Sequence, residues 1–193
     1  MSRDRKPFVL FVTAVLAVVL VVVCLAIWLS QRSSGPPDSP PAISAPVSNS
    51  PNAESQARLL RLLPPGYGSG SCEPAALSNG ALAVVNCAKN SDPGGPVSAT
   101  YTLVRDQAAL QATFDAIVRD SAVVVCPGNI QSPGPWRRNA TPQQTSGTLF
   151  CGFQQSGPKV TWTTDDDLLV STVTGDPRGP NLDQLYAWWS SHS

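Results

Sequence analysis

An uninterrupted apolar stretch occupies residues 8–29, where no charged side chain occurs in 22 positions. A helix of this length spans roughly 33 Å at about 1.5 Å per residue, enough to cross the hydrocarbon core of a bilayer. Three basic side chains lie in the preceding residues 1–7, whereas Arg32 alone closely follows the stretch. By the positive-inside rule, this pattern predicts a single transmembrane helix with a cytoplasmic N-terminus.

A cleaved signal peptide is the alternative interpretation of this stretch. The apolar core of a signal peptide has about 7–15 residues and ends at a small-residue cleavage site. Residues 8–29 exceed that length, and no such site follows them. Cys24 follows three valines, whereas a lipidated cysteine needs a small residue before it. We therefore expect an uncleaved anchor in the cell membrane, with Cys24 as an ordinary apolar residue.

Residues 30–52 are rich in proline and serine and contain almost no large apolar side chain. Such a segment cannot bury enough surface to offset the entropy lost on ordering, so we expect a disordered tether. Residues 53–193 follow, and about 140 residues suit one domain with its own core. The predicted order is a cytoplasmic tail at 1–7, a membrane helix at 8–29, the tether and an extracytoplasmic domain.

Three segments of the outer domain have apolar residues at helical spacing. The predicted helices cover residues 52–63, residues 107–120, and residue 182 to the end of the chain. Each follows a side chain suited to capping a helix, namely Ser50 or Asn52, Asp106, and Asn181. Gln184, three residues after Asn181, completes a capping box for the last helix.

Five segments have the composition of β-strands. They are residues 81–87, 99–104, 148–153, 159–164 and 168–173. Tyr101 and Leu103 alternate with threonines, the pattern of a strand with one buried face. A long loop is predicted at 129–146. Groups of strands joined by tight turns favour an α+β domain, a mainly antiparallel sheet with helices packed on one face.

The outer domain contains four cysteines, Cys72, Cys87, Cys126 and Cys151. An even number in an oxidising compartment favours two disulfide bonds. Three pairings are possible, and we favour Cys72–Cys87 with Cys126–Cys151 because each pair joins neighbouring segments. A zinc site needs close pairs such as C-x2-C, and the sequence has none.

The charge distribution shows no nucleic-acid or anionic-lipid footprint. The formal net charge is zero, and residues 56–193 contain nine Lys and Arg against ten Asp and Glu. No basic stripe is present. Charged residues make up 13% of the chain, which is more typical of a secreted domain than of a cytosolic enzyme.

The sequence Trp136-Arg137-Arg138 in the long loop is the candidate ligand-binding site. An indole ring beside two guanidinium groups can stack on a sugar-like group and bind an anion through bidentate hydrogen bonds. The competing interpretation places the tryptophan at the edge of the core and both arginines in solvent.

Other clusters favour structural roles. Asp165, Asp166 and Asp167 occupy an expected turn, and three consecutive acids point in different directions, so a solvated turn is favoured over a metal site. Trp188 and Trp189 point about 100° apart on a helix. We therefore expect Trp189 in the core and Trp188 half-buried, rather than a sugar-binding platform.

No catalytic constellation stands out. His192 is the single histidine, and its place near the chain end predicts a mobile side chain rather than a positioned base. Nucleophilic catalysis of the Ser–His or Cys–His type then lacks its usual base. A carboxylate-pair hydrolase using Asp115 or Asp176 is formally open, although their spacing does not favour it. We expect no enzymatic activity, no cofactor and no metal.

Several short motifs follow one another across residues 59–193. They are Leu-Pro-Pro-Gly-Tyr at 63–67, Ala-Leu-Ala…Cys at 81–87, Cys-Pro-Gly at 126–128, Gly-Thr-Leu-Phe-Cys-Gly at 147–152, Val-Thr-Trp-Thr at 160–163 and Leu-Tyr-Ala-Trp-Trp at 185–189. In these motifs the chain resembles the outer domain of single-pass mycobacterial membrane proteins, some of which carry a cytoplasmic serine/threonine kinase. The resemblance implies an actinobacterial envelope protein with a sensor-like or binding domain, and it supplies no catalytic residue. The predicted seven-residue tail has no room for a kinase.

The leading functional hypothesis is a membrane-anchored extracytoplasmic binding module of the cell envelope. Its partner would be an envelope ligand or another membrane protein. The alternatives are a structural or assembly subunit of a membrane complex and, less favoured, a carboxylate-dependent envelope hydrolase.

Overall fold

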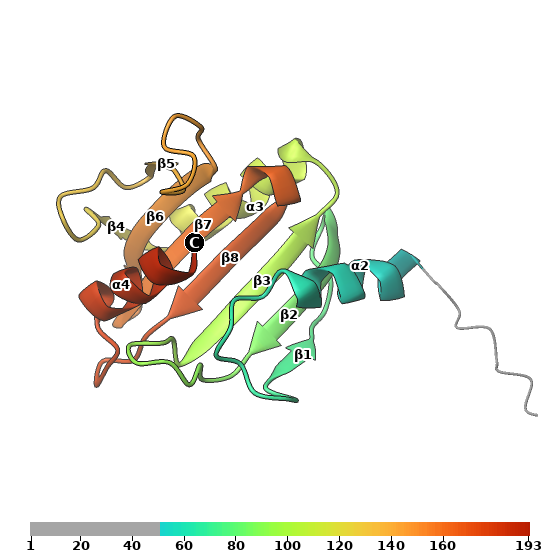
Figure 1. The fold of residues 1–193 in the computed structure, drawn as a ribbon, viewed down its shortest axis with the longest axis horizontal. Helices are drawn as coiled ribbons and strands as arrows, with labels where there is room; N and C mark the ends of the chain where they lie inside the picture. The colour runs from blue at the N-terminus through green and yellow to red at the C-terminus, as the bar shows by residue number, and fades with distance from the viewer. Residues whose placement is uncertain (1–50) are drawn as a thin grey trace, which may run out of the picture. The chain divides into compact units, whose positions relative to one another are not determined.

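Eight β-strands form one sheet within residues 51–193, the part of the chain that the computed structural model describes. The strands are β1 (Cys72–Pro74), β2 (Ala81–Cys87), β3 (Ser98–Val104), β4 (Ala122–Val124), β5 (Gly134–Trp136), β6 (Gly147–Gln154), β7 (Gly157–Thr164) and β8 (Leu169–Thr174). Their order is β1-β2-β3-β8-β7-β6-β4, β5 pairs with β6, and every pair is antiparallel (Figure 1). The α+β class and the antiparallel sheet are confirmed.

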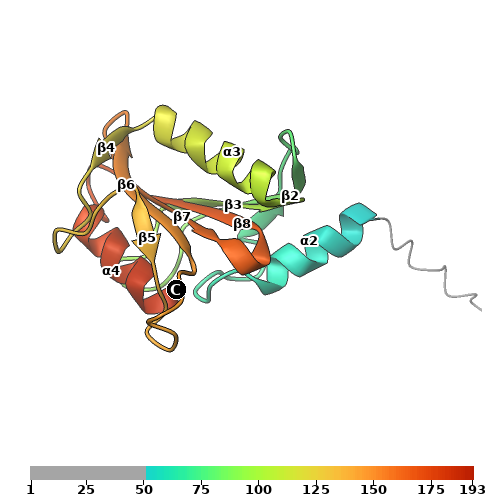
Figure 2. The same cartoon turned by 90° about the horizontal axis from the view of Figure 1, so that it is seen from above.

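Three helices cover both faces of this sheet. They are α2 (Pro51–Arg61), α3 (Gln107–Arg119) and α4 (Leu182–His192). Figure 2 shows α2 and α4 on one face and α3 on the other. Leu59 and Leu185 belong to one buried cluster, whereas Leu110 packs with Val104 and Val170 in a second. The prediction that the helices pack on one face is therefore wrong.

The physical reason for this error lies in the central strands. Side chains alternate between the two faces of a strand, and polar threonines were expected to face solvent. Instead α3 lies over them, and Thr102 is only 7% exposed. A threonine carries a methyl group as well as a hydroxyl, so a threonine-rich face accepts a covering helix, which alternation alone does not reveal.

Both predicted disulfide bonds form, with the pairing expected from the sequence. Cys72 and Cys87 lie directly opposite each other in the β1–β2 pair. Cys126, just after β4, joins Cys151 in β6. Cys87, Cys126 and Cys151 are all buried, so the sulfur atoms are part of the core.

The caps of α3 and α4 are those the sequence predicts. The Asp106 carboxylate accepts a hydrogen bond from Ala109 N, and the Asn181 side chain accepts one from Gln184 N at 2.9 Å. Gln184 Oε1 in turn accepts from Asn181 N, which completes the capping box. Helix α2 differs, because it begins at Pro51 and Asn52 is inside it rather than at its cap. Proline fits the first turn of a helix, where its missing N–H has no partner to lose.

Replacing Asn181 by Ala is expected to lower the free energy of unfolding by about 1 kcal/mol, because the hydrogen bond from Gln184 N to the Asn181 side chain is lost at the start of α4. Chemical denaturation measures this change. Asn139→Ala is the matched control, because Asn139 is exposed in a loop. Equal effects of the two substitutions would contradict the capping role.

The predicted tail, membrane helix and most of the tether lie outside the described residues. Within residues 51–193, none of the helices combines the length and apolar character needed to cross a bilayer. The anchor at 8–29 therefore stays a prediction from the sequence.

Candidate functional site

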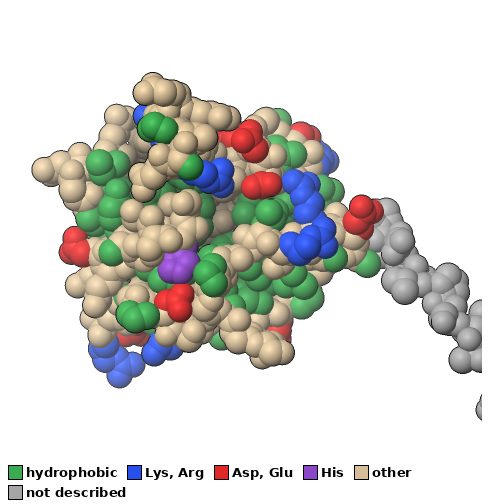
Figure 3. Space-filling model, in the orientation of Figure 1, with side chains coloured by type: hydrophobic (Ala, Val, Ile, Leu, Met, Phe, Trp, Pro, Cys, Tyr) green, Lys and Arg blue, Asp and Glu red, His purple; other side chains and the backbone are tan. Residues whose placement is uncertain are grey.

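A hollow of about 340 Å³ opens on the face of the sheet that carries α2 and α4. We call it the aromatic hollow. Its buried lining comes from β3, β5, β7 and β8 and consists of Tyr101, Trp136, Trp162, Thr164, Leu169 and Ser171. Its rim includes Arg61, Arg138, Asp167 and His192. Figure 3 shows basic (blue) and acidic (red) side chains around apolar ones on this face, with the histidine (purple) near the end of α4.

Trp136 is held rigidly as one wall of the aromatic hollow. Its Nε1 donates a hydrogen bond of 2.8 Å to the Thr163 carbonyl, and its ring meets Trp189 edge-on at 5.7 Å. Strand β5, which carries it, was not predicted, because a three-residue strand containing proline has too little pattern of its own. Its pairing with β6 holds these three residues in an extended conformation. A Cβ on Gly147, the residue opposite Trp136, would collide with the Thr163 carbonyl, so this approach requires glycine.

The structure separates the two arginines of the predicted binding sequence. The Arg138 guanidinium lies 5.4 Å from the centre of the Trp136 ring and lines the aromatic hollow. Arg137 is exposed and is not among its lining residues. Alternation along an extended chain sends neighbouring side chains to opposite sides. Trp136 itself is 5% exposed, so it belongs to the core and to the hollow at once.

Ser171 is a buried polar group without a partner. It is 1% exposed, and its Oγ has no hydrogen-bond partner among the described residues. A buried hydroxyl left unpaired costs about 1–3 kcal/mol. Because Ser171 lines the aromatic hollow, a group bound there can supply the missing partner. The sequence could have indicated this burial in one way, because Ser171 alternates with Leu169 and Val173 and so shares their face of β8.

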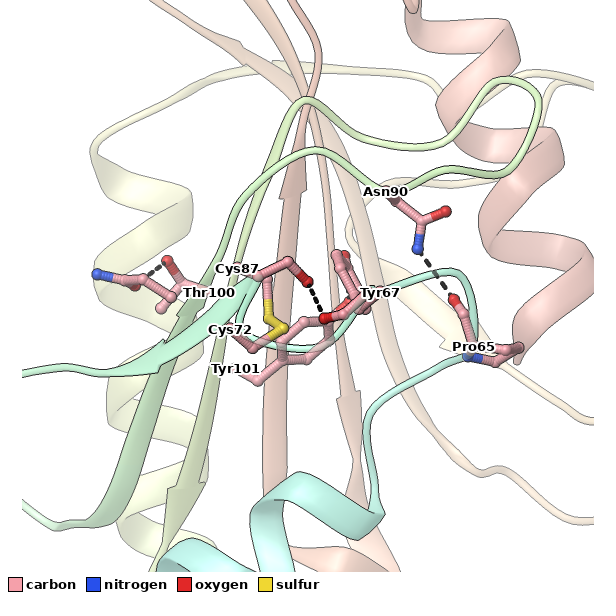
Figure 4. The surroundings of a disulfide bond; sticks show 10 residues. Pro65, Tyr67, Cys72, Cys87, Asn90, Thr100 and Tyr101 are labelled. Atoms are coloured by element: carbon pink, nitrogen blue, oxygen red, sulfur yellow. Dashed lines mark hydrogen bonds between the residues drawn. A yellow bond between two sulfur atoms is a disulfide. The ribbon is translucent and has the colours of Figure 1, made fainter.

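The loop after α2 forms another wall of the hollow, and a buried asparagine holds it. Asn90 is fully buried and donates a hydrogen bond to the Pro65 carbonyl at 2.9 Å. Beside it, the hydroxyl groups of Tyr67 and Tyr101 lie 2.9 Å apart, next to the Cys72–Cys87 disulfide (Figure 4). Burial raises the pKa of both phenols above the ordinary value. Both therefore stay neutral at physiological pH and act as hydrogen-bonding groups, not as bases.

His192 is held in place, contrary to the prediction of a mobile chain end. Its ring stacks on Trp188 at 4.5 Å, and Nε2 lies 3.0 Å from Asp92 Oδ2. Its Nδ1 lies 2.7 Å from the Trp188 carbonyl and 2.9 Å from Ser191 Oγ. Ser191, His192 and Asp92 thus follow the order of a catalytic triad. The Ser191 hydroxyl, however, donates its proton to the Trp188 carbonyl at 2.8 Å, so it is not directed at the imidazole as the serine of a working triad would be.

The last helix also corrects one burial prediction. Trp189 is 6% exposed, as expected for the core, but Trp188 is 2% exposed rather than half-buried. The ring of His192 covers Trp188, a contact one helical turn away that the apolar stripe did not include. Neither tryptophan offers a flat exposed ring for a sugar.

The acidic residues do not gather into a catalytic or metal site in the described part of the chain. Asp165, Asp166 and Asp167 form a short 3-10 turn, and among residues 51–193 there is no cluster of three metal-ligating side chains. Asp115 hydrogen-bonds Gln111, whereas the backbone N–H of Arg178 lowers the pKa of Asp176. A general acid needs the opposite shift of its pKa.

Comparison of the chain with models of known protein families, with curated proteins and with solved structures finds no match in any of the three.

Proposed function

We propose that the chain is a membrane-anchored, extracytoplasmic binding module of the cell envelope, with no catalysis of its own. Its ligand is an anionic, sugar-like group that enters the aromatic hollow. Support for the location comes from the apolar residues 8–29 and from the two disulfide bonds, which are typical of an oxidising compartment.

The observation that carries the proposal is the unpartnered hydroxyl of Ser171 beneath an aromatic lining. Ligand pockets usually combine an apolar lining with a few placed polar groups, and about 340 Å³ lies within the usual volume range. Trp162 lies opposite Ser171 in the β7–β8 pair, and Trp136 lines the same hollow. A ring that carries hydroxyl groups can contact the indoles and hydrogen-bond Ser171 together.

The preference for an anion comes from the rim. Arg61 and Arg138 line the hollow, and neither forms an ion pair with another residue of the described domain. Asp167 is the one acidic side chain among the lining residues, against these two arginines. A guanidinium group matches a carboxylate or phosphate through two parallel hydrogen bonds.

The test is a fluorescence titration of the full-length chain in detergent. Trp136 and Trp162 line the hollow and act as reporters. N-acetylmuramic acid, which carries a carboxylate, is expected to give a saturable change, and neutral N-acetylglucosamine a much weaker one. Arg138→Gln is expected to weaken binding of the anionic sugar about tenfold, because a charge-assisted hydrogen bond contributes about 1.5–3 kcal/mol.

Arg137→Gln is the matched control, because this neighbouring arginine is exposed and does not line the hollow. The affinity of this variant for N-acetylmuramic acid should equal that of the unmodified chain. Equal losses for both arginine variants, or equal binding of the charged and neutral sugars, would contradict the proposed site.

A further inference from the structure

A second hollow, also of about 340 Å³, lies on the opposite face of the sheet, beside the last turns of α3. Its lining side chains include four threonines of β3 and β8, namely Thr100, Thr102, Thr172 and Thr174. Lys159 of β7 and Asp120, the residue that caps the end of α3, also line it. We call it the threonine hollow. It shares no residue with the aromatic hollow.

Lys159 is a buried cation without a counter-ion. It is 4% exposed, and its Nζ donates to Gln154 Oε1 at 2.7 Å and to Ser121 Oγ at 3.4 Å. Both acceptors are neutral, and no carboxylate of residues 51–193 lies within the 4.0 Å of an ion pair. A lysine ammonium has three donors, so one remains for a further acceptor. Burial lowers the pKa of Lys159, as expected for a charge that lacks a close partner.

Asp120 gives the same hollow a negative charge. Its carboxylate attracts the Lys159 ammonium across a distance longer than an ion pair. The carbonyl end of the α3 dipole adds partial negative charge at the same place. Asp120 is exposed, whereas Lys159 is buried, so the two charges lie at different depths.

We propose that the threonine hollow binds a free α-amino acid, whose carboxylate pairs with Lys159 and whose ammonium group pairs with Asp120. A simple anion would be repelled by the Asp120 carboxylate, and a simple cation would be repelled by the Lys159 ammonium. A zwitterion satisfies both. Thr102 lines the same hollow and carries a side-chain hydroxyl that can donate to the ligand carboxylate. This inference does not depend on the ligand of the aromatic hollow.

Calorimetric titration of the full-length chain in detergent tests the proposal. The probes are glycine, L-leucine and L-glutamate, each compared with its N-acetyl derivative, which lacks the ammonium group, and its α-methyl ester, which lacks the carboxylate. At least one free amino acid is expected to bind at least tenfold more tightly than both of its blocked forms. Absence of binding by all three up to about 10 mM overturns the proposal. Equal binding of either blocked form overturns it as well.

Two substitutions locate the site. Lys159→Met and Asp120→Asn are each expected to weaken amino-acid binding at least tenfold. Lys159→Met removes a buried charge and Asp120→Asn changes an exposed side chain, so both variants should fold, which circular dichroism checks. Lys89→Met and Asp183→Asn, at exposed positions outside this hollow, are the matched controls. Unchanged binding in both Lys159→Met and Asp120→Asn would overturn the assignment.

The variant Arg138→Gln separates the two proposed sites. It is expected to retain amino-acid binding while it loses affinity for the anionic sugar, because Arg138 lines only the aromatic hollow. A loss of amino-acid binding in this variant would place that ligand in the aromatic hollow and overturn the inference.

Discussion

Replacement of both Cys126 and Cys151 by Ala is expected to lower the free energy of unfolding by about 3.5 kcal/mol or more. The two cysteines are 25 positions apart, and a cross-link over a loop of this size restricts the unfolded chain by about that amount. Loss of two buried sulfur atoms adds to it, because Cys126 and Cys151 are 2% and 0% exposed. The bond also holds the start of the loop that carries β5 against β6. Removing it should loosen the wall formed by Trp136.

The measurement is denaturant unfolding of the full-length chain, followed by tryptophan fluorescence. The double variant Cys72→Ala with Cys87→Ala is the comparison. Its loop is shorter, with a separation of 15, and β1 and β2 are neighbours joined by backbone hydrogen bonds as well. We expect this variant to lose about 3 kcal/mol of unfolding free energy, with less disturbance of the aromatic hollow. A loss below about 1 kcal/mol for the Cys126–Cys151 pair would show that the bond does not constrain the domain.

Replacement of Trp189 by Ala is expected to cost about 3–5 kcal/mol, the range for deleting a large buried aromatic side chain. Its ring contacts Trp136, Trp162 and Tyr186 at centroid distances of 5.7, 6.4 and 5.3 Å. Trp136 and Trp162 line the aromatic hollow, so the cavity left by alanine removes support from directly behind it. Binding of the anionic sugar should fall together with stability.

Trp189→Phe is the matched variant for this prediction. The Nε1 of Trp189 is buried and has no hydrogen-bond partner in the described residues, so phenylalanine loses no hydrogen bond. It keeps an aromatic ring against the same neighbours, and we expect a loss of about 1–2 kcal/mol. Thermal unfolding distinguishes the two. Comparable melting temperatures for Trp189→Ala and Trp189→Phe would mean that the contacts of this ring contribute little.

The aromatic hollow and the threonine hollow lie on opposite faces of one sheet. Strand β8 contributes to both hollows, because Ser171 lies on one of its faces and Thr172 on the other. A strand covered by helices on both faces can line two separate hollows. The aromatic hollow has an apolar lining and a basic rim, whereas the threonine hollow has hydroxyl groups and one charge of each sign. Different chemistry is therefore expected on each face.

Local signals in the sequence predicted the elements of the fold that depend on nearby residues. Asp106 and Asn181 cap their helices as expected, since a capping side chain bonds backbone only two or three residues away. The strands at 81–87 and 159–164 were found because their composition suits a sheet wherever it is packed. The disulfide pairing followed from the same logic, because each bond joins neighbouring segments.

Only the tertiary structure decided which side chains meet across the sheet. The sequence predicted Trp136 as a site residue, but it contained no sign that Arg138 lines the hollow while Arg137 does not, or that Ser171 lies buried beside them. It also did not show that α3 covers the threonine face or that Lys159 is buried there. These properties depend on the order of strands and on the helices that cover each face. The sequence by itself determined the local elements and the disulfide pairing, and it predicts an anchor at 8–29. Tertiary packing determined where the unpaired polar groups lie, because their burial depends on which strands and helices meet.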